Sequence, residues 1–196
     1  MKIRTHMDIA RLAIKNVKNR IKLNRFEKIL FYVGTIEPDF SITQFIYPHF
    51  YIKSSEYIYL KIKNLQLNEK KGLISAFELG RVVHYLSDFC CYVHASGDIG
   101  NVTEHLLYER NINKYLKTNF NAIFEELICK TSSINKFDNS ILSIKALIEE
   151  YKLARPCFFN DIEKSTEICT VLLDVLYNSN SVLYNKITTN EIKLAL

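Results

Sequence analysis

The sequence predicts an all-α fold, a compact multi-helix single domain, from three observations. Apolar residues recur every three to four positions through most of the chain, which is the period of one buried helix face. No segment shows the strict apolar–polar alternation of a half-buried strand. The 196 residues are 48% hydrophobic, enough to bury one core, and include no repeat or low-complexity linker. We therefore expect residues 1–196 to form one domain.

In the first half of the chain, five segments are expected in order. The first helix follows an apolar stripe formed by Ile9, Leu12, Ala13, Ile14, Val17 and Ile21. The second helix covers about 24–33 and ends at Gly34, because glycine often stands just past a helix end. Residues 34–52 hold two of the three prolines and many aromatics, which predicts an ordered loop. Two more helices are expected over about 54–66 and 73–95.

The next helix is predicted from its N-terminal signature. Residues 96–100 contain two glycines and form the expected turn. Asn101, with Glu104 three positions later, is typical of a helix N-terminus, where the amide side chain accepts free backbone N–H groups. A further helix is expected near 119–130.

The C-terminal region, from about residue 111, contains helical patterns and no functional motif. One helix is expected over about 139–154, ended by Pro156, which lacks the backbone N–H that a helix interior needs. Asn160 with Glu163 is expected to open a last helix that runs to about residue 184. This region, 111–196, is expected to provide packing rather than chemistry.

The charge distribution leaves two interpretations open for the N-terminal segment. The net charge is +5, and the first 28 residues hold many cations against only Asp8 and Glu27. Such a segment is either the solvated face of a helix or a surface for phospholipid headgroups or nucleic acid. The basic residues are Lys2, Arg4, Arg11, Lys15, Lys18, Arg20, Lys22, Arg25 and Lys28.

Cysteine usage and hydropathy bear on the compartment. The five cysteines are odd in number and show no C-x-x-C spacing, so free buried thiols are expected rather than a redox pair at Cys90 and Cys91. No apolar run is long enough to cross a bilayer. The basic N-terminus lacks the apolar stretch of a signal peptide, so the cytoplasm is expected, or secretion if a leader has been removed.

Residues 84–109 gather three of the five histidines and carry the strongest functional signal. His84 and Asp88 are four apart and share one helix face, as do His105 and Glu109 on the next helix. His94 would point about 240° away from Asp88 in a straight helix, but at the helix end it can face the second pair. The spacing therefore predicts two separate metal sites, the first needing a further ligand from elsewhere. Imidazole and carboxylate ligands without thiolate suit zinc, more often in catalytic than in structural sites.

The order H-x3-D-x5-H-x10-H-x3-E in this stretch resembles the core signature of the zinc-dependent phospholipase C family. It is also similar to that of the zinc-dependent single-strand nucleases. The order continues outward to Thr5-His6, to the segment GTIEPD that ends at Asp39, and to His49. The resemblance covers about residues 5–110 and implies a helical phosphodiesterase built around two or three Zn²⁺ ions.

The resemblance also implies roles for individual residues. Asp88 would bridge two zinc ions, and His84 would share one of them with His49. His94, His105 and Glu109 would hold another. Asp39 would be either a ligand or the base that activates the attacking water, with Glu37 as a competing candidate. The full set of metal candidates is His6, Asp39, His49, His84, Asp88, His94, His105 and Glu109.

The third zinc position departs from the family pattern. In the family, a histidine, the bridging aspartate and the amine of an N-terminal tryptophan hold this ion. The present chain has no tryptophan, and Met1 stands five residues before His6. His6 is therefore a candidate ligand, whereas a ligand role for the Met1 amine requires that the amine be unmodified and folded inward.

The expected function is zinc-dependent hydrolysis of a phosphodiester, of the phospholipase C type. Asp39 would assist the attack by a water molecule. The expected partner is a phospholipid or another phosphodiester, with transient contact to a membrane surface. Two alternatives remain: a nuclease on the same fold, acting on nucleic acid, and a non-catalytic metal-binding module. Aromatic residues around Asp39 and His49 fit either enzyme, by lining a lipid pocket or by stacking bases. They are Phe40, Phe45, Tyr47, Phe50 and Tyr51.

Overall fold

The computed structural model describes residues 1–17, 23–68, 72–95, 101–131 and 141–194. Within these ranges the chain forms helices and no strand, so the all-α prediction is confirmed. In chain order the elements are α1 (Ile3–Asn16), α2 (Arg25–Ile36), the 3₁₀ helix η1 (Glu37–Asp39), α3 (Thr43–Ile46), α4 (Tyr51–Leu67), α5 (Leu73–Phe89), α6 (Tyr92–Ala95), α7 (Val102–Thr131), α8 (Ile141–Leu153) and α9 (Phe158–Leu194).

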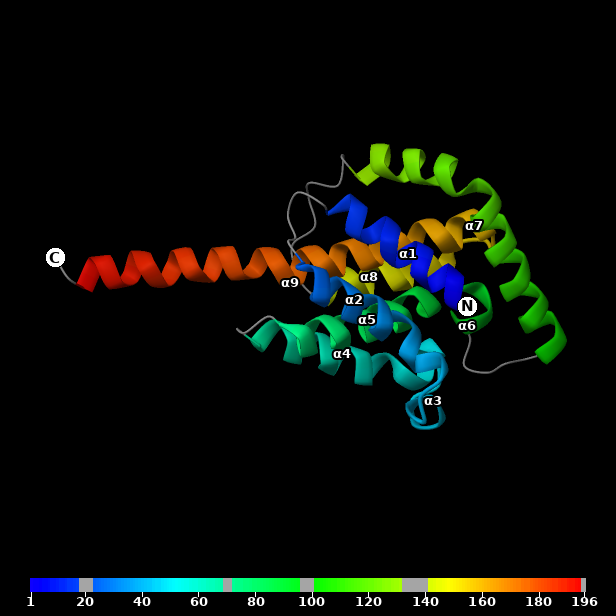
Figure 1. Ribbon diagram of the computed structural model, residues 1–196, viewed down its shortest axis with the longest axis horizontal. Coiled ribbons are helices and arrows are strands. Elements are labelled where there is room, and N and C mark those ends of the chain that lie inside the picture. The colour runs from blue at the N-terminus through cyan, green and yellow to red at the C-terminus, as the bar shows by residue number, and fades with distance from the viewer. Residues whose placement is uncertain (18–22, 69–71, 96–100, 132–140, 195–196) are drawn as a thin grey trace.

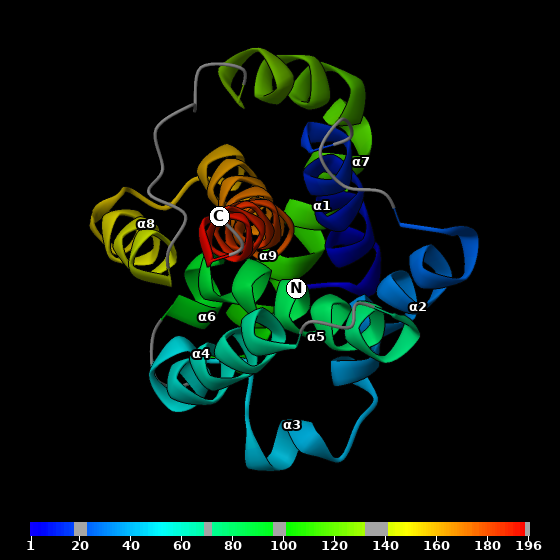
Figure 2. The same cartoon turned by 90° about the vertical axis from the view of Figure 1, so that its left-hand side faces the viewer.

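Helix α5 and the first part of α9 form the centre of the helical assembly, and the C-terminal part of α9 extends beyond the other helices (Figures 1 and 2). α5 packs against α2, α4 and α9, while α9 also packs against α1 and α8. The contact is apolar: Val83 and Leu86 on α5, and Ile168 and Leu172 on α9, are fully buried. Burying each such side chain stabilises the fold by about 1.5–3 kcal/mol. No helix in the described ranges combines the length and apolarity that a membrane crossing needs.

Gly34 does not end α2, contrary to the sequence prediction; it lies within the helix at the contact with α5. A Cβ atom on Gly34 would lie 2.0 Å from the carbonyl oxygen of Phe77, and one on Gly80 would lie 2.1 Å from that of Phe31. Both glycines are therefore needed for the close approach of the two helix backbones. This approach brings the carbonyl oxygen of Thr35 within 2.8 Å of His84 Nδ1, so it also positions the candidate site.

Substituting Gly80 with alanine is expected to destabilise the protein by about 3 kcal/mol, because the added methyl group must push backbone atoms apart. Gly72→Ala is the matched control, since a Cβ there has no neighbour within 4 Å. Its effect is expected to stay below about 1 kcal/mol. Urea unfolding measures the free energy of unfolding of both variants. Equal effects at the two positions would show that α2 and α5 do not depend on the glycine contact.

Several helices form where the sequence predicted them. α1, α2, α4 and α8 match the expected segments within a few residues, although Ile21 of the first apolar stripe lies outside the described residues, as does the expected turn at 96–100. Asn101 caps α7 as predicted, because its Oδ1 accepts the backbone N–H of Thr103 at 3.0 Å. The expectation of free buried thiols is confirmed for Cys90, Cys91 and Cys169, whereas Cys157 is free but exposed.

Other boundaries differ from the prediction. The expected helix 73–95 is broken, because α5 ends at Phe89 and α6 begins at Tyr92. The region 34–52 is not only a loop, since it contains η1 and α3. The two helices expected from 101 and over 119–130 are one continuous helix, α7. α9 begins at Phe158 rather than at Asn160, and it continues past residue 184 to Leu194.

Candidate metal centre

The structure brings all eight candidate metal ligands together at one end of α5. They come from α1, η1, the segment before α4, α5, α6 and α7. They form three groups, in each of which one ligand atom per residue lies within 4.8 Å of the others. The groups are His6, His84 and Asp88; Asp39, His49 and His84; and His94, His105 and Glu109.

Asp88 stands between these groups and is fully buried. Its Oδ2 lies 3.3 Å from His49 Nδ1 and 3.4 Å from His84 Nε2. Its Oδ1 lies 3.5 Å from His6 Nε2 and 3.7 Å from His94 Nε2. Each carboxylate oxygen thus faces a different pair of imidazoles, which is the arrangement that a bridging ligand needs.

Hydrogen bonds at Nδ1, on the side of the ring away from Asp88, determine the tautomers of two imidazoles. His84 Nδ1 donates to the carbonyl oxygen of Thr35 at 2.8 Å. The hydroxyl of Ser87 donates to the carbonyl oxygen of His84 at 2.7 Å, so it accepts from His6 Nδ1 at 2.8 Å. Both rings therefore carry their proton on Nδ1 and direct an Nε2 lone pair at Asp88. Such outer hydrogen bonds are typical of metal-ligating histidines.

The residues fit a metal ion because the Nε2 lone pairs of His6 and His84 face the lone pairs of the Asp88 carboxylate oxygens. Burial lowers the pKa of His84 to about 3, and burial together with His84 holds the pKa of His6 well below its usual value. Both imidazoles are therefore neutral, and no proton lies between them and the Asp88 carboxylate. Among the described residues, the buried His6 Nε2 and Asp88 Oδ2 have no hydrogen-bond partner. Unpaired buried acceptors are costly, and a cation between them would satisfy all of them.

The backbone amine of Met1 lies inside the same cluster. It is fully buried, 2.6 Å from Asp88 Oδ1, 3.1 Å from His94 Nε2 and 3.3 Å from Glu109 Oε1. Burial lowers its pKa, but the charges of Asp88 and of the neighbouring groups outweigh burial and raise it to about 11. The amine is folded inward, as a ligand role would require, but it carries a proton that a bound metal ion would have to displace.

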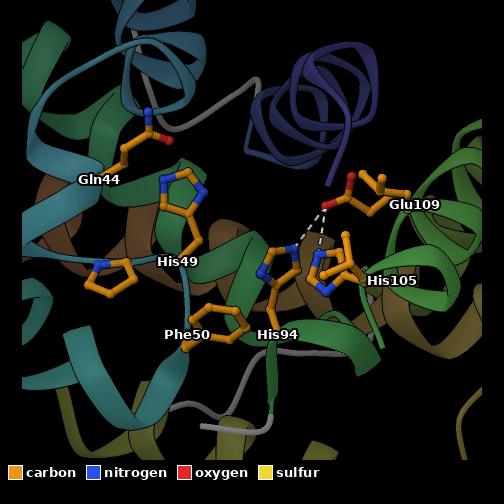
Figure 3. Close-up of a pocket in the computed structure, with 9 residues that line it drawn as sticks. Gln44, His49, Phe50, His94, His105 and Glu109 are labelled. Carbon is orange, nitrogen blue, oxygen red and sulfur yellow. Dashed lines mark hydrogen bonds and ion pairs between the residues drawn. The ribbon is translucent and has the colours of Figure 1, made fainter. Parts of the chain in front are cut away.

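The third group lies on the other side of the Met1 amine, in α6 and α7. Glu109 Oε1 is 3.1 Å from His94 Nε2 and 3.2 Å from His105 Nε2 (Figure 3). Burial raises the pKa of Glu109, but its hydrogen bond to His94 and the Met1 amine outweigh burial and lower it. The break after Phe89 turns His94 towards Asp88. His94 therefore faces His105 and Glu109, as its place at the helix end predicted, and it also lies 3.7 Å from Asp88, so the two predicted sites adjoin.

Asp39, and not Glu37, lies among the histidines. Asp39 Oδ1 is 3.7 Å from both His49 Nδ1 and His84 Nε2. Burial and the nearby Asp88 charge raise the pKa of Asp39 to about 6. Glu37 instead forms an ion pair with Arg81 at 2.9 Å, outside all three groups.

A pocket of about 290 Å³ opens onto the third ligand group and His49 (Figure 3). Its walls combine candidate ligands with apolar side chains: Gln44, Pro48, His49, Phe50, His94, Val102, His105, Leu106 and Glu109. Of the aromatics singled out in the sequence, Phe50 lines this pocket. Tyr47 instead stacks on Tyr57, and the Tyr51 hydroxyl donates to Glu149. Phe40 and Phe45 are 70% and 79% exposed.

No sequence pattern pointed to Asp161, a fully buried carboxylate of α9 that supports the site through hydrogen bonds. Its Oδ2 accepts the backbone N–H of Tyr92 at 3.0 Å and the hydroxyl of Tyr108 at 2.8 Å. Its Oδ1 accepts the hydroxyl of Tyr151 at 2.7 Å. Tyr92 begins α6, which carries His94, and Tyr108 precedes Glu109 on α7. Asp161 therefore ties the two helices of the third ligand group to α8 and α9.

Replacing Asp161 with alanine is expected to destabilise the protein by about 3 kcal/mol or more, because three buried donors lose their acceptor. The variant should also retain less zinc, since α6 and α7 are no longer held together. Asp161→Asn keeps one acceptor oxygen and should restore part of both properties. Thermal melting and elemental analysis give the two readouts. An alanine variant that melts and binds zinc as the parent does would exclude this role.

Fold and site together define an all-α protein with adjoining ligand groups of histidine and carboxylate, of the kind that binds zinc. A family model described as zinc-dependent phospholipase C matches residues 5–158. The chain therefore belongs to the zinc-dependent phospholipase C family, as the sequence resemblance implied. Neither a functionally curated protein nor a solved structure gives a match. The matched range contains all eight candidate ligands and ends before Asp161.

Proposed function

We propose that this protein is a zinc-dependent phosphodiester hydrolase of the phospholipase C type. One observation carries the proposal: each oxygen of the buried Asp88 carboxylate faces two imidazoles, next to a pocket of about 290 Å³. Membership of the family supports the same conclusion.

The proposed ligands divide into three sets, two of which share Asp88. One ion would be held by Asp39, His49, His84 and Asp88, and a second by His94, His105 and Glu109. A third would be held by His6, Asp88 and the amine of Met1 as it stands in this chain. When bound, zinc ions supply a water of lowered pKa and positive charge that offsets the charge developing on the phosphoryl oxygens.

The remaining roles belong to the chain itself. Asp39 is proposed to orient the attacking water and to take its proton, because its carboxylate lies at the edge of the ligand groups and is less buried than Asp88. Phe50 packs beside His94 and excludes water from that side of the pocket, with ring centroids 5.5 Å apart. The reaction consumes one water: its oxygen bonds to phosphorus, the phosphorus–alkoxy bond breaks, and the products are an alcohol and a phosphomonoester.

The pocket walls favour a lipid diester over a nucleic acid. Pro48, Phe50, Val102 and Leu106 give the pocket an apolar lining. The nuclease alternative needs aromatic rings at the site that can stack bases, and Tyr47 and Tyr51 are engaged elsewhere. The lipid class is therefore the preferred substrate class, and its headgroup is not specified by these walls.

A side-by-side assay of the zinc-loaded protein tests this function. Nitrophenyl-phosphocholine and short-chain phosphatidylcholine are expected to be cleaved, at rates that fall when zinc is removed by chelation. Single-stranded DNA is expected to be cleaved much more slowly. Rapid cleavage of DNA with none of lipid would instead favour the nuclease. No cleavage of any substrate by a fully zinc-loaded protein would favour the non-catalytic module.

A further inference from the structure

Large apolar side chains are exposed on two segments that contribute to the pocket walls, α3 through Gln44 and the start of α7 through Val102 and Leu106. The segment from η1 to α3 exposes Phe40 (70%), Ile42 (77%), Phe45 (79%) and Ile46 (65%). The start of α7 exposes Val102 (57%) and Leu106 (51%), both of which line the pocket. These six side chains are called the apolar collar below. Single exposed apolar residues are ordinary, but a group of this kind beside a pocket marks an interaction surface.

The segment that carries most of the collar is held in place by polar contacts. None of the residues of α3 is buried, so packing does not fix this helix. Arg81 of α5 does so instead: its Nη2 donates to Thr43 Oγ1 at 3.2 Å, and its Nε pairs with Glu37 at 2.9 Å. The hydroxyl of Thr43 donates in turn to Ser41 Oγ at 2.8 Å. α3 projects beyond the neighbouring helices (Figures 1 and 2), and Phe45 and Ile46 on it are exposed.

Two lysines lie beside side chains that line the pocket. Lys2 is 45% exposed on its side chain, and its Nζ lies 3.5 Å from Glu109 Oε2. Lys53 is exposed, and its Nζ lies 5.4 Å from the centroid of the Phe50 ring. Apolar side chains at a rim, with lysines beside them, suit the boundary between lipid headgroups and acyl chains.

We propose that the apolar collar docks this protein on a phospholipid surface, with the pocket facing the headgroups. The position of the pocket decides between lipid and protein as the occupant. A folded protein seated on the collar would cover the pocket mouth, whereas a lipid surface brings phosphodiesters to it. The purpose of docking, which is to bring lipid to the pocket for cleavage, rests on the proposed function. The docking itself can be measured without hydrolysis.

The test is a vesicle flotation assay on the zinc-loaded 196-residue chain, with Asp39→Asn in the parent and in every variant so that lipid is not consumed. Vesicles of phosphatidylcholine, and of phosphatidylcholine with one-third phosphatidylserine, are the probes. The test variant is Ile42→Ser with Phe45→Ser. The matched control is Ile74→Ser with Leu153→Ser, which removes two side chains that are 82% and 89% exposed on other elements. Removing two inserting side chains is expected to weaken vesicle binding by on the order of 100-fold, against no more than about twofold for the control.

A second readout uses zinc-loaded protein with Asp39 in place and separates docking from chemistry. The collar variant is expected to lose cleavage of vesicle lipid while it keeps the parent rate on soluble nitrophenyl-phosphocholine and the parent melting temperature. Absence of vesicle binding by the parent, or equal binding by parent and collar variant, would overturn the docking proposal whatever the hydrolysis results. A parent that dimerises through the collar would also overturn it. Collar-dependent vesicle binding by a protein that cleaves no diester would uphold docking and contradict the proposed function.

Discussion

Replacing Asp88 with alanine is expected to remove metal binding and much of the stability together. Both carboxylate oxygens face imidazoles of separate groups, so its loss would leave more than one ion without a ligand. It would also leave the buried Met1 amine, 2.6 Å away, without its main counter-charge. Breaking a buried ion pair by removing one partner costs about 3–5 kcal/mol. Metal binding and folding are coupled, so the loss of zinc should add to this destabilisation.

Elemental analysis after zinc reconstitution and thermal melting measure the two effects. Asp8→Ala is a matched control, because Asp8 is also a buried carboxylate, 7% exposed, and pairs with Arg4 and Arg11 outside the ligand groups. The control should keep its full zinc content. Each single histidine variant should lose less zinc than Asp88→Ala. Full zinc content and an unchanged melting temperature in Asp88→Ala would show that Asp88 does not bridge.

Replacing Asp39 with asparagine is expected to lower the rate of diester hydrolysis by about 10²–10⁴-fold, the usual contribution of a positioned general base. Asparagine keeps the size of the side chain but takes up no proton. The zinc content of the variant separates the two roles that the sequence left open. Unchanged zinc with a low rate indicates a base, whereas the loss of one equivalent indicates a ligand.

Glu37→Gln is the control for Asp39→Asn, because Glu37 is a nearby carboxylate that pairs with Arg81 instead of facing the histidines. Its rate on a soluble diester should stay within a few-fold of the parent rate. The substrate should be nitrophenyl-phosphocholine, so that any change in lipid docking does not enter the comparison. If Asp39→Asn retained the parent rate, or if Glu37→Gln lost it, the assignment of Asp39 would be wrong.

The parts of the site that follow from local geometry could be predicted from the sequence. The i,i+4 spacing places His84 with Asp88, and His105 with Glu109, on shared helix faces, and the structure has both pairs. The approach of His94 to Asp88 could not be predicted, because the helix breaks at Cys90 and Cys91 without a glycine or proline to signal it. Gly34 was misread for a related reason: a glycine can end a helix or allow close packing, and only the neighbouring helix decides.

The parts that depend on contacts between distant segments could not be predicted. Ser87 looks like any polar residue of a helix until His6, from another helix, is placed against it. Asp161 follows the family match and carries no motif, yet it joins the elements that bear His94 and Glu109. The inward position of the Met1 amine is likewise set by how α1 packs, and not by the residues around it in the sequence.

The central claim is that zinc ions bind on both sides of Asp88, and anomalous X-ray scattering at the zinc absorption edge tests it most directly. Crystals of the zinc-loaded protein would be measured above and below the edge. We expect one anomalous peak among Asp39, His49, His84 and Asp88 and another among His94, His105 and Glu109, both of which vanish below the edge. The absence of zinc peaks at these residues, in crystals whose solution contains zinc, would contradict the claim.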